Sequence, residues 1–182
     1  MSDDAPRSIY VSPWRIDVTT RPGIRFPLSR AAIARAVAEA LAAAGAPSPG
    51  SVAVVLTDDE ELAELNLEHM GHDGPTDVLS FPMLEPEAFG RGEGPPRPAG
   101  RAPAAESRLH IGDIAISVER AAEQADQGRG GQTGDVRWAL ADELRLLVTH
   151  GTLHLCGWDH AEPGEEAAMR ALERRLLGLA EG

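Results

Sequence analysis

Three histidines near the end of the chain have the spacing of a metal site. His150, His154 and His160 lie in the segment His-Gly-Thr-Leu-His-Leu-Cys-Gly-Trp-Asp-His at residues 150–160. Helical residues four apart project from nearly the same side, so the first two imidazoles are expected to point together. Gly157 is expected to end that helix and turn the chain back, which brings His160 towards the same point. Three imidazoles with a fourth position open are typical of catalytic zinc, so the sequence predicts one zinc ion at a helix C-terminus.

Two neighbouring residues distinguish this zinc site from structural zinc sites and from those of zinc proteases. Structural zinc usually has four protein ligands, mostly cysteines. Cys156 is the only cysteine, but it lies two residues past His154 and points away from it on a helix, so we interpret it as a small buried apolar residue. Zinc proteases with similar spacing have a glutamate general base directly after the first histidine. Here that residue is Gly151, so the only catalytic group that we predict is a water bound by the zinc.

The composition is that of one domain spanning residues 1–182. No apolar run is long enough to cross a membrane, and the acidic N-terminus lacks the apolar region of a signal peptide. The single cysteine excludes an internal disulfide framework. We therefore expect a cytoplasmic protein without a membrane partner. The net charge of −12 argues against a general nucleic-acid binder, and the oligomeric state stays open.

Hydrophobic periodicity predicts alternating strands and helices around the histidine motif. The helix that carries His150 and His154 is expected at 135–156, and Ile33, Val37 and Leu41 are expected to form the buried stripe of an earlier helix. Proline and glycine are frequent in residues 83–107, where we expect a mobile insertion. The expected strands are 8–18 with a break at Pro13, 51–56, 78–81 and 108–117; the other expected helices are 29–44, 57–70, 118–127 and 165–179.

Three motifs together resemble the YbeY family of ribosomal-RNA maturation endoribonucleases. They are the histidine motif, Gly-Pro-Thr-Asp-Val-Leu-Ser-Phe-Pro at 74–82, and Ile-Gly-Asp-Ile-Ala-Ile-Ser at 111–117. The resemblance covers roughly residues 50–180. It implies an α/β (α+β) fold with a small mixed sheet, here of about four strands flanked by about five helices.

The resemblance also implies a function. A zinc ion would be held by His150, His154 and His160, and the protein would cleave single-stranded RNA. The implied role is in small-subunit ribosomal RNA maturation and ribosome quality control, with single-stranded regions of ribosomal RNA and the ribosome or its assembly factors as partners.

Further site residues follow from this chemistry. Each ligating imidazole needs its second ring nitrogen oriented by a carboxylate or carbonyl. Asp159 and Asp113 are candidates, with Asp77 a weaker one, and Asp159 alternatively caps the turn after it. Ser80 and Phe81 are candidate substrate contacts in the cleft. Phe81 would stack on an unpaired base, or alternatively pack in the core.

One departure from the family concerns Met70, where many members have an arginine implicated in catalysis or RNA binding. A methionine cannot neutralise a phosphate. Either another arginine substitutes for it or this branch works without one. The candidates in or beside the insertion are Arg91, Arg97, Arg101 and Arg108, which would contact phosphates or alternatively belong to a solvated linker.

Two other functions compete with the endoribonuclease. The first is a non-catalytic ribosome-assembly factor with an architectural zinc, which Met70 and the acidic charge favour. The second is a zinc peptidase-like hydrolase, which Gly151 disfavours. An open fourth coordination position favours catalysis, whereas a shell closed by four protein ligands favours an architectural role.

Overall fold

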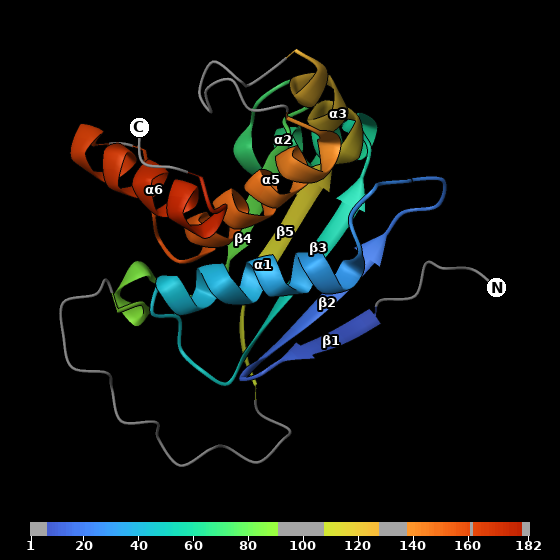
Figure 1. The fold of residues 1–182 in the computed structure, drawn as a ribbon. Coiled ribbons are helices and arrows are strands. Elements are labelled where there is room, and N and C mark those ends of the chain that lie inside the picture. Colours follow the sequence, from blue (N-terminus) through green and yellow to red (C-terminus); the bar gives the residue numbers. More distant parts are fainter. Residues whose placement is uncertain (1–6, 91–107, 128–137, 161, 180–182) are drawn as a thin grey trace.

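A mixed five-stranded sheet forms the centre of the protein (Figure 1). The computed structural model describes residues 7–90, 108–127, 138–160 and 162–179. Across the sheet the order is β1-β2-β3-β5-β4. The strands β2, β3 and β5 are parallel to one another, and β1 and β4 are antiparallel edge strands. Their bounds are β1 Arg7–Val11, β2 Trp14–Thr20, β3 Gly50–Thr57, β4 Val78–Pro82 and β5 Leu109–Ser117.

The sheet has one strand more than the sequence predicts. The segment expected as one interrupted strand is a hairpin, in which Val11 pairs with Trp14 across Ser12 and Pro13. Proline has no N–H to donate to a ladder, and here the chain reverses completely at that residue. The expected mixed sheet flanked by helices is confirmed, with five strands in place of four.

Five α-helices and a short 3₁₀ helix surround the sheet in the part of the chain that the structure describes. Each α-helix corresponds to an expected one, with ends that differ by a few residues. The first begins after Ser29, whose side chain accepts a hydrogen bond from the Ala32 N–H. The bounds are α1 Arg30–Ala43, α2 Asp59–Met70, η1 Pro86–Ala88, α3 Val118–Asp126, α5 Leu140–Leu155 and α6 Pro163–Leu176.

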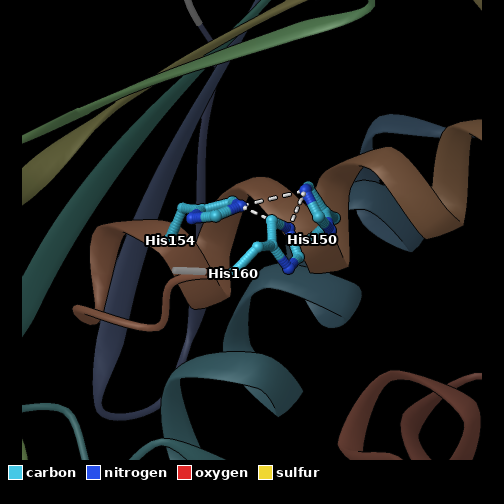
Figure 2. A group of neighbouring side chains, drawn as sticks. All are labelled: His150, His154 and His160. Carbon is cyan, nitrogen blue, oxygen red and sulfur yellow. Dashed lines mark hydrogen bonds between the residues drawn. The ribbon is translucent and has the colours of Figure 1, made fainter. Parts of the chain in front are cut away.

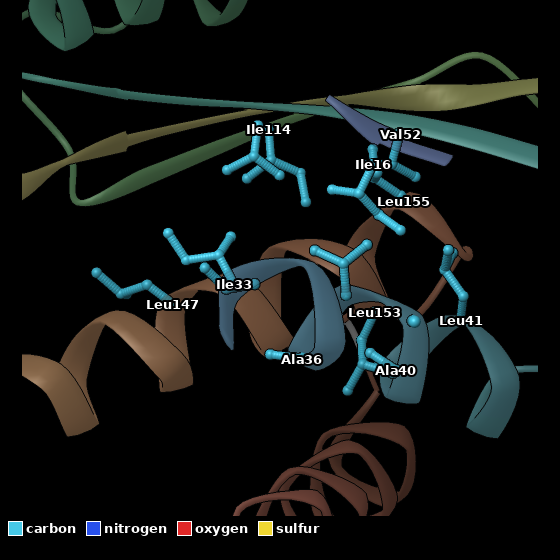
Figure 3. Packing of buried hydrophobic residues seen from close by; sticks show 14 of the residues in the cluster. Ile16, Ile33, Ala36, Ala40, Leu41, Val52, Ile114, Leu147, Leu153 and Leu155 are labelled. Atoms are coloured by element: carbon cyan, nitrogen blue, oxygen red, sulfur yellow. The ribbon is translucent and has the colours of Figure 1, made fainter. Parts of the chain in front are cut away.

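Two apolar clusters lie on opposite faces of the sheet. The larger one packs α1 and α5 against the sheet (Figure 3), and it buries the predicted stripe of Ile33, Val37 and Leu41 completely. The smaller one packs Leu62 of α2 against β4 and β5. Alternation along β5 separates the two, because Ile114 belongs to the larger cluster and Ala115 to the smaller. Helices α2 and α5 therefore cover different faces.

Part of the expected insertion is integrated into this fold. The Met83 N–H donates to the Ile111 carbonyl, Phe89 is buried in the larger cluster, and the Gly90 N–H donates to the Gly45 carbonyl. Residues 91–107, which include three of the four arginines considered above, lie outside the described residues. Among the described helices, none is both long and apolar enough to span a membrane.

Candidate metal centre

The three predicted histidines converge at the C-terminal end of α5 (Figure 2). The Nε2 atom of His154 lies 2.9 Å from that of His150 and 3.2 Å from that of His160, and the third pair is 3.4 Å apart. Zinc–nitrogen bonds of ~2.0–2.1 Å in a tetrahedral shell place neighbouring donor atoms about 3.3 Å apart. The donor set and its spacing therefore fit a divalent ion such as zinc.

The turn that follows α5 determines where the His160 side chain lies. The Trp158 N–H donates to the Leu153 carbonyl and the Gly157 N–H to the His154 carbonyl, which is the Schellman pattern of a helix end. Gly157 has a φ of +82°, a left-handed conformation that side-chain-bearing residues adopt at a cost. This turn reverses the chain so that His160 faces His150 and His154.

Glu173 of α6 orients the first histidine. Its Oε1 atom lies 2.6 Å from the Nδ1 atom of His150, and the residue is only 8% exposed. An ionised carboxylate only accepts hydrogen bonds, so Nδ1 carries the proton and the Nε2 lone pair faces the other histidines. Glu173 was not predicted from the sequence, in which its only signal is a carboxylate next to the apolar residue Leu172.

Burial keeps two polar groups of this region uncharged. It lowers the pKa of His154 below its ordinary value of 6.5, and the positive charge that His150 and His160 would carry lowers it further. A neutral His154 at neutral pH has a lone pair for a metal. Burial also raises the pKa of the Cys156 thiol to about 12, so the thiol keeps its proton, as expected of a buried apolar residue.

Among the described residues, the histidines form the one group of side chains suited to hold a metal. Cys156 is not part of that group and is buried in the larger apolar cluster. Three histidines bound to one ion would leave one tetrahedral position for a further ligand.

The structure places the three candidate aspartates differently from one another. Asp159 accepts a hydrogen bond from the His160 N–H at 2.7 Å and so caps the turn, as in the alternative given above. Asp113 is not beside the metal centre: its carboxylate lies 2.9 Å from His110 Nε2. Asp77 and His150 both line a cleft that adjoins the metal centre. The Asp77 carboxylate accepts a hydrogen bond from the Gln124 amide.

Ser80 and Phe81 do not line that cleft. Consecutive strand residues point to opposite faces, and here Ser80 faces α5 whereas Phe81 packs against the smaller cluster. The Ser80 hydroxyl donates to the Gly151 carbonyl at 2.9 Å, so it fixes the helix that carries His150. The Phe81 ring lies 5.1 Å from the His69 ring in an edge-on contact.

Gly151 allows this helix to approach the sheet. A Cβ atom there would lie 3.0 Å from Ile114 Cγ2 and 3.1 Å from Val78 Cγ2. The position that holds the general base in zinc proteases therefore faces the sheet in this protein.

Comparison with known proteins identifies the family. The family model described as "Endoribonuclease YbeY" matches residues 24–180. The chain belongs to the YbeY family. This membership confirms the resemblance seen in the three motifs.

Curated YbeY relatives are similar over most of the chain. The Endoribonuclease YbeY of Salinispora tropica is 48% identical over 126 residues, 69% of this chain and 71% of the relative. That of Symbiobacterium thermophilum is 42% identical over 75% of this chain and 76% of its own. That of Thermobifida fusca is 38% identical over 89% of this chain and 91% of its own.

Met70 lies apart from the metal centre in this YbeY protein. It is the last residue of α2, on the face of the sheet opposite α5, and it is 45% exposed. A methionine side chain has no positive charge, so Met70 cannot neutralise a phosphate. Either an arginine from another part of the chain substitutes for it, or this branch works without one.

We expect Gly157→Ala to weaken both folding and metal binding. The left-handed backbone costs a residue with a Cβ roughly 1–2 kcal/mol, and the new Cβ would lie 2.9 Å from that of Pro86. Relief of this contact displaces the turn and His160 with it. Thermal unfolding and zinc titration of the purified protein measure the two effects.

The matched control is Gly178→Ala after α6, where φ is +70° and no atom lies within 4 Å of an added Cβ. It should lose similar backbone stability and keep its zinc affinity. Equal zinc affinity in the two variants would contradict the role assigned to the Gly157 turn.

We expect Glu173→Gln to lower zinc affinity by roughly 10-fold, because a neutral amide oxygen accepts the hydrogen bond from Nδ1 of His150 more weakly than a carboxylate does. Glu166→Gln on the same helix is the control, since the Glu166 carboxylate pairs with Arg170 at 2.6 Å. Competition with a chromophoric chelator measures both variants. Unchanged affinity in Glu173→Gln would show that the negative charge behind His150 does not strengthen zinc binding.

Proposed function

We propose that this protein is a zinc-dependent, single-domain endoribonuclease that cleaves single-stranded regions of ribosomal RNA. The proposed setting is small-subunit ribosomal RNA maturation and ribosome quality control, with the ribosome or its assembly factors as partners. Membership of the YbeY family makes it a nuclease that hydrolyses RNA phosphodiester bonds. The observation that carries the zinc dependence is the convergence of the three Nε2 atoms at the edge of a cleft.

Zinc bound by three neutral imidazoles supplies Lewis acidity, which lowers the pKa of water and stabilises negative charge on phosphoryl oxygens. The protein's own residues prepare for this chemistry. Glu173 holds a proton on His150 Nδ1, burial keeps His154 neutral, and the Gly157 turn places His160.

The architectural alternative has less support. A closed shell needs a fourth protein ligand, and the described residues near the three histidines include no further group placed to act as one. The nearest thiol in the sequence, Cys156, is buried and protonated at neutral pH. The peptidase alternative is weakened because position 151 faces Ile114 and Val78 and has no room for a glutamate.

We expect His154→Ala to lose zinc and RNA cleavage while it keeps its fold. A metal ion contributes several kcal/mol to stabilisation of the transition state. Each 1.36 kcal/mol corresponds to a tenfold change in rate, so we expect kcat to fall by roughly a thousandfold. Zinc content by mass spectrometry, circular dichroism and cleavage of a single-stranded RNA measure the three properties. Chelation should abolish cleavage by the natural protein, and added zinc should restore it.

The control is His110→Ala, which removes an exposed histidine from β5 on the face opposite the centre. It should retain both zinc and activity. Cleavage by a zinc-free His154→Ala protein, or by the chelated natural protein, would contradict the proposed function.

A further inference from the structure

A cleft of about 450 Å³ adjoins the metal centre and extends between α5 and α6. This volume lies within the range of about 300–1,000 Å³ that small ligands occupy. His150 and His160 form one end of the lining. The remaining lining combines the carboxylates of Asp77, Glu166 and Glu173 with cationic, aromatic and aliphatic side chains. The cationic, aromatic and aliphatic members used below are Trp138, Arg170, Arg174, Leu177 and Leu179.

Two arginines bring positive charge to this cleft in a protein whose net charge is −12. Arg170 and Arg174 are four residues apart on α6, so they project from the same side of the helix, and both line the cleft. Guanidinium groups are suited to phosphate because they donate two parallel hydrogen bonds.

Each of the three carboxylates that line the cleft has a hydrogen-bond or ion-pair partner. Glu173 bonds His150, Glu166 pairs with Arg170, and Asp77 accepts hydrogen bonds from the Gln124 amide and the Val78 N–H. Arg170 is on the surface and its contact with Glu166 is an exposed i,i+4 pair, the kind that contributes little. A phosphate can therefore compete for it.

Trp138 supplies an aromatic surface in the same cleft. Its indole N–H donates to the buried carboxylate of Glu143 at 2.5 Å, which fixes the ring at the start of α5. Unpaired bases stack on aromatic side chains of this kind. Leu177 and Leu179 extend the apolar part of the lining.

We propose that this cleft binds the nucleotide next to the scissile phosphate of a single-stranded RNA. The base of this nucleotide stacks on Trp138. Arg170 and Arg174 contact the phosphate next to the one that is cleaved at the metal centre. The proposal rests on the proposed function, and it assigns to α6 the cationic role that Met70 does not fill.

Binding of a fluorescent single-stranded RNA to the zinc-loaded protein tests the arginines. Anisotropy is read before cleavage, at several salt concentrations. Arg174→Ala and Arg170→Ala should each raise Kd several-fold and reduce the slope of log Kd against log salt by about 0.7, the value for one lost phosphate contact on a single strand. Arg175→Ala is the matched control, because Arg175 is exposed on the same helix and is not among the residues that line the cleft.

The aromatic surface is tested by two substitutions of one residue. Trp138→Ala should raise Kd roughly tenfold through loss of stacking. Trp138→Phe also loses the hydrogen bond to Glu143 but keeps an aromatic ring, so it should bind nearly as the natural protein does. Zinc content and thermal unfolding are measured for every variant.

The results separate this proposal from the proposed function. Equal effects of Arg174→Ala and Arg175→Ala, or of Trp138→Ala and Trp138→Phe, would overturn the cleft assignment even if the natural protein cleaves RNA. The natural protein could also bind RNA without cleaving it, while the variants weaken binding as predicted. This result would support RNA binding in the cleft and contradict the proposed endoribonuclease activity. A natural protein that neither binds nor cleaves RNA would overturn both.

Discussion

The candidate metal centre depends on three imidazole nitrogens that face one another within 3.4 Å. Nitrogen lone pairs at this distance repel, and protonated rings would repel more strongly. A divalent cation between them turns the same geometry into three favourable bonds. Burial of His154 favours the neutral ring that such a cation requires, and the Glu173 carboxylate at Nδ1 of His150 orients the Nε2 atom of that ring towards the other two.

The rest of the fold holds these rings in place. Helix α5 is anchored by buried leucines, among them Leu147, Leu153 and Leu155, that pack against α1 and the sheet. The Ser80 hydroxyl adds a hydrogen bond to the Gly151 carbonyl between two metal-centre histidines. Helix α6 then returns Glu173 to the centre. Ligand positions are therefore set by the apolar core, in which side chains have little freedom to shift.

The sequence predicted the parts of the site that depend on local geometry. His150, His154, Gly157 and His160 lie within eleven consecutive residues, and helix period plus a glycine turn is enough to bring them together. Glu173 could not be found this way, because it comes from another helix and its contact depends on how α6 packs. All five α-helices were predicted, from apolar periodicity or from residues typical of helix ends, whereas the hairpin at Pro13 was predicted only as a break in one strand.

Other site predictions depended on which face a strand residue occupies. Ser80 and Phe81 are consecutive, so strand geometry alone prevents both from facing one cleft. Asp113 lies on the face of β5 away from α5, together with His110, although the two are three residues apart. The register shift between β3 and β5 at Ser51/Val52 accounts for this, and such a bulge is not evident in the sequence.

X-ray absorption at the zinc edge of the zinc-loaded protein identifies the ligands of the bound ion. We expect three imidazole nitrogens at ~2.0–2.1 Å and oxygen in the remaining position, without sulfur. A sulfur neighbour at ~2.3 Å, or fewer than three imidazole ligands, would contradict it.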